Sequence, residues 1–254
     1  KSGAEKQETS PCKKDCPAHN DVQGYVTLAA KGKYQEALQL IKETSPFPSI
    51  CGRVCHHPCE SNCNRKQIDE PLAIQSIERF LADQDFFSRK PYVPKVKEAR
   101  DEKIAIIGSG PAGLTAAYFL AREGYQVTIF EKLPVAGGMM VVGIPEYRLP
   151  RDVISREIRV IQDMGVEIKT GVTFGKDITL QSLKHDGYQA VFLATGLHQN
   201  RRLNIDKEDL KDVLKGVDFL RDVSFGNPVS IGKRVIVIGG GNVAIDVALT
   251  SIRK

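Results

Sequence analysis

The sequence predicts a helical N-terminal segment followed by an α/β region that is built on a parallel β-sheet. Up to about residue 90 the apolar side chains recur at helical spacing, and no strand-like alternation occurs before residue 100. Beyond residue 100, apolar strand patterns alternate with helix patterns, which is typical of parallel strands joined by helices. All six cysteines lie within the first 63 of the 254 residues, so the helical segment is expected to form a specialised module.

Two helical stretches and a linker make up this N-terminal segment. Residues 21–44 have the apolar spacing of two short amphipathic helices, which are separated near Gly32. Residues 71–87 open with Pro71, a residue that favours the start of a helix, and keep their apolar side chains largely on one side. Residues 88–103 combine basic and acidic side chains with two prolines, so we interpret them as a linker rather than as a binding patch.

Several apolar segments of the α/β region have the character of strands. Residues 103–107 and 126–130 flank an alanine-rich helix, residues 166–170 and 189–196 follow, and residues 233–238 precede another helix. The two strand–glycine–helix signals near residues 104 and 235 predict two Rossmann-like dinucleotide-binding domains, the second truncated at Lys254. We expect domains at 1–95, with a linker to about residue 102, then 103–230 and 231–254, as in a fragment of a longer protein.

Composition excludes several classes of protein. Hydrophobic residues make up 41% and charged residues 26% of the chain, which is ordinary for a globular protein with an ample apolar core. The net charge of +5 arises from 36 basic and 31 acidic residues, so nucleic acid is not an expected partner. No apolar run approaches the ~18–20 residues of a membrane span, and the polar N-terminus lacks a secretion signal. We therefore expect a cytoplasmic location, where disulfides are rare.

The motif GSGPAG directly follows the first strand and predicts a dinucleotide site. Gly108 allows a tight turn, Gly110 lets backbone amides approach a pyrophosphate, and Gly113 permits close packing of helix on strand. The phosphates would face the N-terminus of the following helix, where free N–H groups favour negative charge. Glu131 ends the next strand, 18 residues beyond Gly113, and a carboxylate at this place is expected to accept hydrogen bonds from a ribose.

A second glycine motif, GGGNVA, follows the strand that ends at residue 238. Its Gly239, Gly241 and Ala244 fit the variant in which alanine replaces the third glycine. Two such units in one chain suit a flavin and a nicotinamide dinucleotide, one passing hydride to the other. Thr195 and Gly196 end a strand between the two motifs, where the backbone either passes close to a cofactor or simply leaves the sheet.

The segment CGRVCHHPCESNC places a cysteine at every fourth residue, and several kinds of site would explain it. Such a set, with a further pair at Cys12 and Cys16, is improbable as core filling. Zinc binds sets of Cys and His, and His56 and His57 lie within the segment. Iron–sulfur clusters take Cys thiolates. We favour a cluster because it carries single electrons, and a neighbouring flavin converts a two-electron hydride into single electrons.

The ordered motifs of the chain also resemble those of a known family. They are CPAHNDV, CGRVC with its following cysteines, SIERF, IAIIGSGPAGL, GGMMVVGIPEYRLP, AVFLATG and VIGGGNVAIDVA. Together they resemble the small (β) subunit of NADPH-dependent glutamate synthase and its relatives. These include the N-terminal part of dihydropyrimidine dehydrogenase and the flavin subunit of bifurcating NADH–ferredoxin:NADP oxidoreductase. The resemblance runs from about residue 10 to the end of the chain.

The resemblance implies a helical iron–sulfur domain with one or two [4Fe–4S] clusters, an FAD domain and the start of an NAD(P)H domain. It implies an NAD(P)H-dependent oxidoreductase that exchanges electrons with a partner subunit or domain, in a hetero-oligomeric complex. Such chemistry rests on cofactor placement, so no acid–base catalytic residue is expected. The alternatives are an electron-relay or scaffold subunit without turnover and a zinc-stabilised FAD enzyme of the disulfide-reductase type.

Matched motif by motif, the resemblance implies a ligand set for each cluster. The cluster nearest the flavin would take Cys16, Cys55, Cys59 and Glu78. From chemical principle alone Glu78 would instead be a solvated helix acid, because a carboxylate suits iron–sulfur chemistry poorly. The second cluster would take Cys12 and Cys63, although residues 1–11 lack a further cysteine pair that the family has. That cluster is then absent, recruits Cys51, or uses ligands from a partner or from upstream sequence.

The resemblance also implies which residues contact the dinucleotides. For FAD these are Gly108, Gly110, Pro111, Ala112, Gly113, Glu131, Gly138, Arg148, Thr195 and Gly196. For NAD(P)H they are Gly239, Gly241, Asn242, Val243 and Ala244. Two roles stay open for Arg148, which either faces a phosphate or pairs with Glu146.

Overall fold

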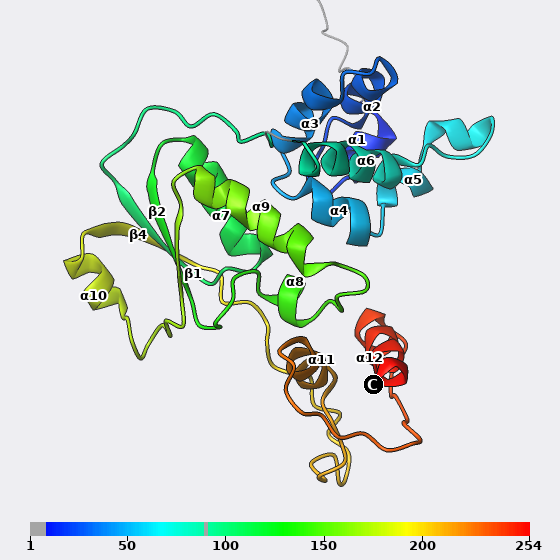
Figure 1. The fold of residues 1–254 in the computed structure, drawn as a ribbon, viewed down its shortest axis with the longest axis vertical. Coiled ribbons are helices and arrows are strands. Elements are labelled where there is room, and N and C mark those ends of the chain that lie inside the picture. Colours follow the sequence, from blue (N-terminus) through cyan, green and yellow to red (C-terminus); the bar gives the residue numbers. More distant parts are fainter. Residues whose placement is uncertain (1–8, 89–90) are drawn as a thin grey trace, which may run out of the picture. The chain divides into compact units, whose positions relative to one another are not determined.

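A computed structural model describes residues 9–88 and 91–254, and the chain divides into two compact units, Lys1–Lys95 and Val96–Lys254. Residues 1–8 and 89–90 lie outside the described residues, and with them most of the polar N-terminus and part of the expected linker. Each unit is described by itself below, and Figure 1 labels its helices and strands. Among the described residues, no helix is both long enough and apolar enough to cross a membrane.

The first unit is helical, as its apolar spacing predicts. Its elements are α1 (Pro11–Asp15), α2 (Val22–Ala30), α3 (Tyr34–Lys42), α4 (Pro48–Val54), α5 (Pro58–Ser61), the 3-10 helix η1 (Asn64–Gln67) and α6 (Ile74–Phe86). Gly32 separates α2 from α3 with φ +74°, a left-handed conformation that suits glycine. Helix α6 begins at Ile74 rather than at Pro71, because the Glu60 carboxylate accepts a hydrogen bond from the Gln75 N–H and caps the first turn there.

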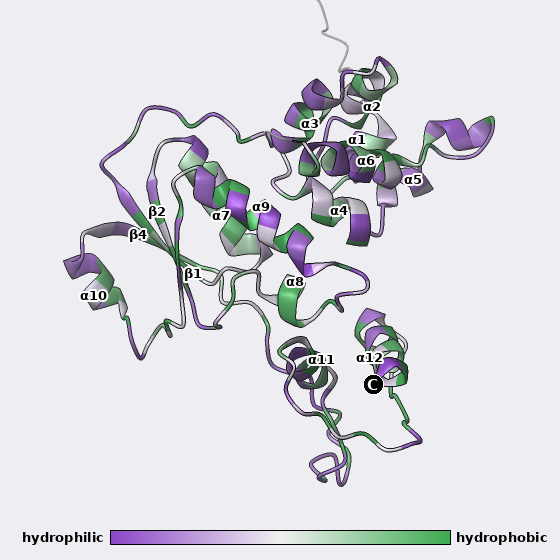
Figure 2. Cartoon of the chain, in the orientation of Figure 1, coloured by the Kyte–Doolittle hydropathy of each residue, from purple (hydrophilic) through white to green (hydrophobic). Residues whose placement is uncertain are grey.

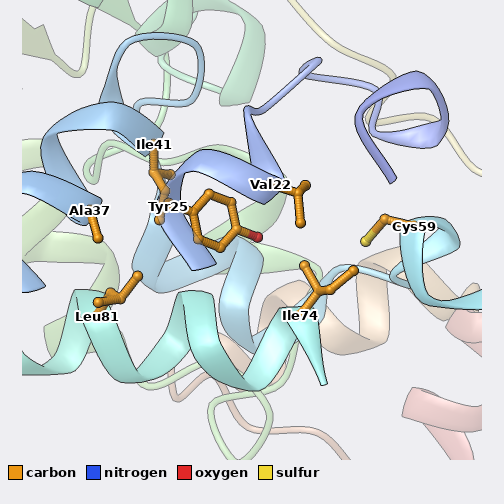
Figure 3. Close-up of a cluster of buried hydrophobic side chains, with 7 residues drawn as sticks. All are labelled: Val22, Tyr25, Ala37, Ile41, Cys59, Ile74 and Leu81. Atoms are coloured by element: carbon orange, nitrogen blue, oxygen red, sulfur yellow. The ribbon is translucent and has the colours of Figure 1, made fainter. Parts of the chain in front are cut away.

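The core of this unit lies between α2, α3 and α6. Its buried side chains are Val22, Tyr25, Ala37, Ile41, Cys59, Ile74 and Leu81, and Figure 3 shows the Tyr25 ring among them. Helix α4 packs closely on α6, since a Cβ atom on Gly52 would lie 2.7 Å from the Arg79 Cα. The cysteine-bearing helix α4 and the helix that carries Glu78 are therefore held together by backbone proximity.

The second unit contains the predicted parallel sheet. Its elements are β1 (Lys103–Ile107), α7 (Pro111–Arg122), β2 (Gln126–Glu131), α8 (Met139–Val142), α9 (Arg151–Asp163), β3 (Glu167–Thr170), α10 (Leu180–His185), β4 (Tyr188–Leu193), α11 (Gly216–Ser224) and α12 (Asn242–Arg253). The strand order is β3-β2-β1-β4 and all neighbours run parallel. Ile106 pairs with Ile129 on one side and with Phe192 on the other.

The two central strands form the buried part of this sheet. In β1 every residue except Lys103 is buried, and in β2 every residue except Gln126. Leu183 of α10 packs with Ala105 and Ile107. Helix α9 turns Val153, Ile154 and Ile161 into the protein interior, and its hydrophobic and hydrophilic residues form bands along the helix (Figure 2).

The expected strand at residues 233–238 is not formed. The segment belongs to no strand in the described residues, and Ile236 and Ile238 are 90% and 71% exposed. A parallel strand exists only where neighbouring strands accept and donate its backbone hydrogen bonds, and here none of the described strands pairs with it. The helix that was expected to follow does form, as α12.

Candidate functional site

Breaks in helical structure distribute the regularly spaced cysteines over different elements. Helix α4 carries Cys51 and ends at Cys55, and Pro58 then starts the short helix α5, which carries Cys59. Between them His57 has φ +44° and ψ +56°, a left-handed conformation that is rare outside glycine. The segment is thus not one helix with a stripe of sulfur atoms. Its turn at residues 55–58 directs Cys55 and Cys59 towards a common pocket.

That pocket lies within the first unit and gathers four of the expected cluster ligands. It is lined by Cys16, Pro17, Asn20, Val22, Tyr25, Cys55, His57, Pro58, Cys59, Ile74, Gln75 and Glu78. Figure 3 shows Tyr25, Val22, Ile74 and Cys59 in this region. Glu78 is only 7% exposed, so the interpretation of Glu78 as a solvated helix acid is wrong. The side chain lies on the inner face of α6, where it completes a set of three thiols and one carboxylate.

The close placement of these groups affects the pKa values of their thiols. Burial raises the pKa of the Cys59 thiol to about 12, with further contributions from Cys16, Glu60 and Cys55. Burial also raises the pKa of Cys55, an effect that the His57 N–H opposes by donating a hydrogen bond to Cys55 Sγ at 3.3 Å. Ionised thiols would thus concentrate negative charge in a buried place, and a bound metal centre would supply the compensating positive charge.

Tyr25 is the side chain in this pocket that sequence reasoning missed. Its ring is 1% exposed. Burial raises the pKa of its phenol strongly, and the negative charges of Glu78, Cys59, Cys16 and Cys12 raise it further. The phenol therefore stays protonated as a hydrogen-bond donor among acceptors. The only sequence signal was its place in the apolar spacing of residues 21–44, which is the signal of an ordinary core residue.

The remaining cysteines do not line this pocket. Cys12 lies on α1 and contacts Ser10 Oγ at 3.4 Å, and Cys63 precedes η1. Asn62 Nδ2 donates to Asp15 Oδ2 at 2.7 Å, which ties the segment before Cys63 to the end of α1. In residues 9–88 and 91–254, no group of three or more His, Cys, Asp or Glu side chains is arranged to hold a metal ion. The ligands of a four-iron cluster bind different iron atoms, so they need to line one pocket rather than meet at one point.

The first glycine motif forms a tight turn at the carboxyl end of β1. Gly108 has φ +104°, and a Cβ atom on it would lie 2.3 Å from the Ala194 carbonyl oxygen. A Cβ atom on Gly113 would lie 1.9 Å from the Gly108 oxygen, which explains the third glycine by packing of α7 on the strand. Gly110 differs, because a Cβ atom there would meet no atom within 4 Å. Packing within the chain therefore does not require a glycine at residue 110. A pyrophosphate that approaches the backbone closely would require one.

Glu131 stabilises this turn from the neighbouring strand. Its Oε2 accepts hydrogen bonds from the Ser109 N–H at 2.8 Å and from Ser109 Oγ at 2.6 Å, and its Oε1 accepts one from the Leu133 N–H at 2.8 Å. Gly137 donates its N–H to Ser109, and a Cβ atom on Gly138 would lie 2.7 Å from the Gly110 Cα. The carboxylate is 6% exposed. Its expected contact with a ribose stays a prediction, and its contacts with the turn are an additional role.

The turn lies where the strand order reverses. The chain runs from β1 to β2 to β3 on one side of the sheet and then returns to place β4 on the other side of β1. In open parallel sheets, ligands bind outside the carboxyl ends of the strands at this point. Strand β4 ends at Leu193, three residues earlier than expected, so Thr195 and Gly196 lie in the loop just beyond it, and Gly196 has φ +71°. The two segments that the sequence singled out, GSGPAG and ATG, thus lie side by side.

Arg148 binds a partner that neither sequence interpretation named. Its Nη1 donates to both carboxylate oxygens of Asp246, at 2.8 and 2.7 Å, so the expected pairing with Glu146 is replaced by one with α12. Arg253, at the end of the same helix, lies 4.0 Å from the centre of the Tyr147 ring. These contacts join the GIPEYRLP loop to the helix of the second glycine motif. A contact of Arg148 with cofactor stays a prediction.

The second glycine motif also forms a turn before a helix. Gly239 has φ +124°, and Gly241 is the N-cap residue of α12. A Cβ atom on Gly241 would meet no atom within 4 Å, and Val243 is 47% exposed. The structure thus presents the amide ends of the first turn of α12, with Asn242 and Ala244, in the manner of the first motif.

Comparisons with known proteins give a family match for each of the two units. Residues 6–90 match the family model "dihydropyrimidine dehydrogenase domain II, 4Fe-4S cluster", and residues 102–253 match the model "pyridine nucleotide-disulphide oxidoreductase". The NADP(+)-dependent formate dehydrogenase subunit beta of Moorella thermoacetica is 45% identical over 97% of this chain and 38% of that protein. The NADPH-Fe(3+) oxidoreductase subunit beta of Geobacter sulfurreducens is 43% identical over 97% of this chain and 37% of that protein.

A further relative and a solved structure are also similar to this chain. The glutamate synthase [NADPH] small chain of Escherichia coli is 36% identical over 96% of this chain and 54% of that protein. The chain therefore spans between about one third and about one half of the length of these three relatives. Among solved structures, FprA of Mycobacterium tuberculosis in complex with NADPH is 31% identical, with a TM-score of 0.52 over 59% of this chain and 36% of that one.

Proposed function

The chain belongs to the pyridine nucleotide-disulphide oxidoreductase family, and on that premise we propose that it is the electron-transferring part of an iron–sulfur flavoprotein that oxidises or reduces NAD(P)H. The resemblance to the glutamate synthase small subunit is confirmed by its relatives, which are named as beta subunits and small chains of NADPH-linked oxidoreductases. Electrons would pass between NAD(P)H, FAD, one or two [4Fe–4S] clusters and a partner subunit.

The observation that carries this proposal is the pocket of the first unit. Its donor set suits a [4Fe–4S] cluster, because three thiolates match the soft ligands that such clusters prefer. The ligands would be Cys16, Cys55, Cys59 and Glu78, all of which line the pocket. For a second cluster the expected ligands are Cys12 and Cys63, completed by Cys51, by a partner or by other sequence.

FAD would bind at the carboxyl ends of β1 and β4. The glycine turn offers backbone N–H groups at the start of α7, a 12-residue helix whose dipole favours a pyrophosphate. Gly110 allows the close approach, and Glu131 fixes the turn through Ser109. Bound there, the flavin would supply the exchange between a two-electron hydride and single electrons. The protein would supply orientation and electrostatics.

NAD(P)H would bind at the second glycine motif, in a second Rossmann-like domain of which residues 231–254 are the start. Helix α12 is held on the GIPEYRLP loop by the Arg148–Asp246 ion pair. This contact ties the helix of the second motif to the GIPEYRLP loop, and hydride transfer between two dinucleotides would require such fixed placement. Together with thiol ligands that need a reducing environment, the family membership supports a cytoplasmic hetero-oligomer.

The test is an anaerobic purification of the full-length protein that contains this chain. We expect flavin absorbance together with iron and acid-labile sulfide, and rapid bleaching of the flavin when NADPH or NADH is mixed with the protein. Protein that contains neither flavin nor iron and sulfide would overturn the proposal. Protein that contains both, but whose flavin is not bleached by either nucleotide, would instead indicate the electron-relay or scaffold subunit.

A further inference from the structure

Gln75 connects the helix that carries Glu78 to the turn that carries Cys55. Its side-chain Nε2 donates hydrogen bonds to two backbone carbonyl oxygens, that of Cys55 at 2.7 Å and that of Cys51 at 3.2 Å. Its own backbone N–H donates to Glu60 Oε1 at 2.8 Å. Three hydrogen bonds thus run between the first turn of α6 and the residues on either side of the sulfur-bearing turn.

The two carbonyl groups belong to the C-terminal end of α4. A helix leaves its last carbonyl groups without partners inside the helix, and another group has to satisfy them. The Cys51 carbonyl oxygen also accepts the Cys55 N–H at 3.0 Å, so the carbonyl group that needs a partner from outside the helix is that of Cys55, the C-cap residue of α4. The Gln75 amide donates to that carbonyl oxygen, at the residue whose sulfur lines the pocket. Loss of this amide would remove the hydrogen bond that ties the Cys55 backbone to α6.

Glu78 follows Gln75 by three residues, about one helical turn, so the two side chains share one face of α6. Both line the same pocket, as does Cys55. The Gln75 amide therefore sets the separation between the carboxylate donor and one of the three thiol donors. The backbone N–H of Gln75 donates to the carboxylate of Glu60, which is the residue next to Cys59. Through Glu60, Gln75 therefore also restrains the second thiol of the turn.

We propose that Gln75 is a positioning residue that fixes Cys55 relative to Glu78 and so secures the carboxylate-bound iron of the cluster. The inference rests on the proposed function, since it concerns the cluster assigned to this pocket. A carboxylate holds iron less firmly than a thiolate. The iron that Glu78 would bind is therefore the first that the cluster would lose if the hydrogen bonds of Gln75 were removed. On oxidation by ferricyanide, [4Fe–4S]²⁺ gives [3Fe–4S]⁺, one Fe²⁺ and ferrocyanide.

The test compares Gln75→Met and Gln75→Glu with the wild type in the full-length, anaerobically purified protein. Both substitutions keep the length of the side chain and remove the two amide N–H donors. We expect the three-iron signal in electron paramagnetic resonance to form about tenfold faster in both variants after ferricyanide is added, since partners behind metal ligands typically contribute 10–100-fold to metal retention. Flavin content should not change.

The matched control is Gln84→Met, the same substitution on the exposed side of the same helix. It should convert at the wild-type rate. Equal rates in all four proteins would overturn the positioning role while leaving the proposed function intact, whereas a wild type without iron and sulfide would overturn the proposed function itself.

A variant that takes up no cluster also tests the positioning role of Gln75. If Gln75→Met lacks iron but keeps the far-ultraviolet circular dichroism of the wild type, the helices are intact and the positioning role is supported. If the helical signal is lost as well, Gln75 serves the fold of the unit as a whole, and the inference is wrong.

Discussion

Glu131 and Ser109 form the hydrogen-bonded centre of the first glycine turn. The position of Glu131 at the end of its strand was predicted from the sequence, but its three acceptor contacts were not. Ser109 gave no signal beyond being a small polar residue between two glycines. The contact between Glu131 and Ser109 depends on how the end of β2 lies against the turn after β1. That placement follows from the register of the sheet, which cannot be read from the identity of either residue.

Glu131→Ala is expected to lower the free energy of unfolding of the flavin-free chain by about 2 kcal/mol, because a buried N–H and hydroxyl of Ser109 lose a charged acceptor. Urea denaturation would measure it. Glu131→Gln retains an acceptor oxygen and should lose less. The exposed Glu123, paired with Lys97 at 2.6 Å, serves as the control, and its replacement by Ala should cause no measurable change. Equal stability of the Ala and Gln variants would contradict the assigned contacts.

Substitution of two glycines of one motif should separate stability from cofactor binding. Gly110→Ala adds a Cβ atom into open space at φ −68°, so the unfolding free energy should stay within about 0.5 kcal/mol of the wild type. The FAD content of the purified protein should fall strongly, because the Cβ atom obstructs the approach of the pyrophosphate.

Gly113→Ala, in the first turn of α7, places a Cβ atom 1.9 Å from the Gly108 oxygen. It should cost about 2 kcal/mol or more of stability, since the strand and the helix have to separate. Thermal unfolding and flavin absorbance of the two variants would show which glycine serves stability and which serves FAD binding. A Gly110→Ala variant with full FAD content would show that the pyrophosphate does not lie against this glycine.

At the scale of elements, helix α12 is held by contacts that link distant parts of the sequence. Arg148 and Asp246 are 98 residues apart. Asp246 is 5% exposed, and it shares the buried side of α12 with Thr250. An isolated acid in the run NVAIDVA was a signal that a buried partner exists, but no local rule could identify Arg148 as that partner.

Asp246→Asn should loosen α12 from the GIPEYRLP loop, because Arg148 then loses its charged partner. Amide hydrogen exchange in α12 is expected to be about fivefold faster, which corresponds to ~1 kcal/mol of local stability. Mass spectrometry of the exchanged protein would locate the change. Arg159→Met, on the exposed face of α9, is the control that removes an arginine without this contact, and exchange in α12 should not respond to it.

Element boundaries show where sequence prediction succeeded and where it failed. The helices over residues 21–44 and the strands β1, β2, β3 and β4 follow from local apolar spacing, which is encoded within each segment. Helix α6 starts at Ile74 instead of Pro71 because the Glu60 side chain, 15 residues away, caps it. Residues 233–238 have strand composition but no strand neighbour among the described elements. Local patterns predict what an element can be, and partners decide whether and where it forms.

At the scale of the whole molecule, the two kinds of site lie in different compact units. The pocket with Cys16, Cys55, Cys59 and Glu78 belongs to the unit that ends at Lys95, and both glycine motifs belong to the unit that begins at Val96. The sequence predicted this separation from the confinement of cysteines to the first 63 residues. The regular spacing of the cysteines did not separate Cys59 from Cys63, four residues later. The family resemblance did separate them, and the lining of the pocket includes Cys59 but not Cys63.

Cys59→Ser should therefore lower the iron and sulfide content by the amount of one cluster without removing flavin. Replacement of a proposed thiolate ligand by a hydroxyl weakens cluster binding, while the proposed FAD site lies in the second unit, where no residue is changed. Metal analysis and flavin absorbance of the same sample are the measurements. Cys51→Ser, whose residue lies one turn before Cys55 but does not line the pocket, should keep the cluster of this pocket. Loss of flavin in Cys59→Ser would show that the two units do not load independently.

The strand order of the second unit also determines when this protein can fold during its synthesis. The central strand β1 pairs with β4, and Lys103 lies opposite Tyr188, 85 residues later in the chain. At about 5–20 residues per second, a ribosome needs roughly 4–17 s to supply that second neighbour. Throughout this interval one edge of the apolar strand β1 lacks its β4 neighbour, whereas the helices described in the first unit precede β1 in the chain and are synthesised before it. The second unit is thus the part of this chain in which we expect an unpaired strand edge to be exposed to aggregation during synthesis.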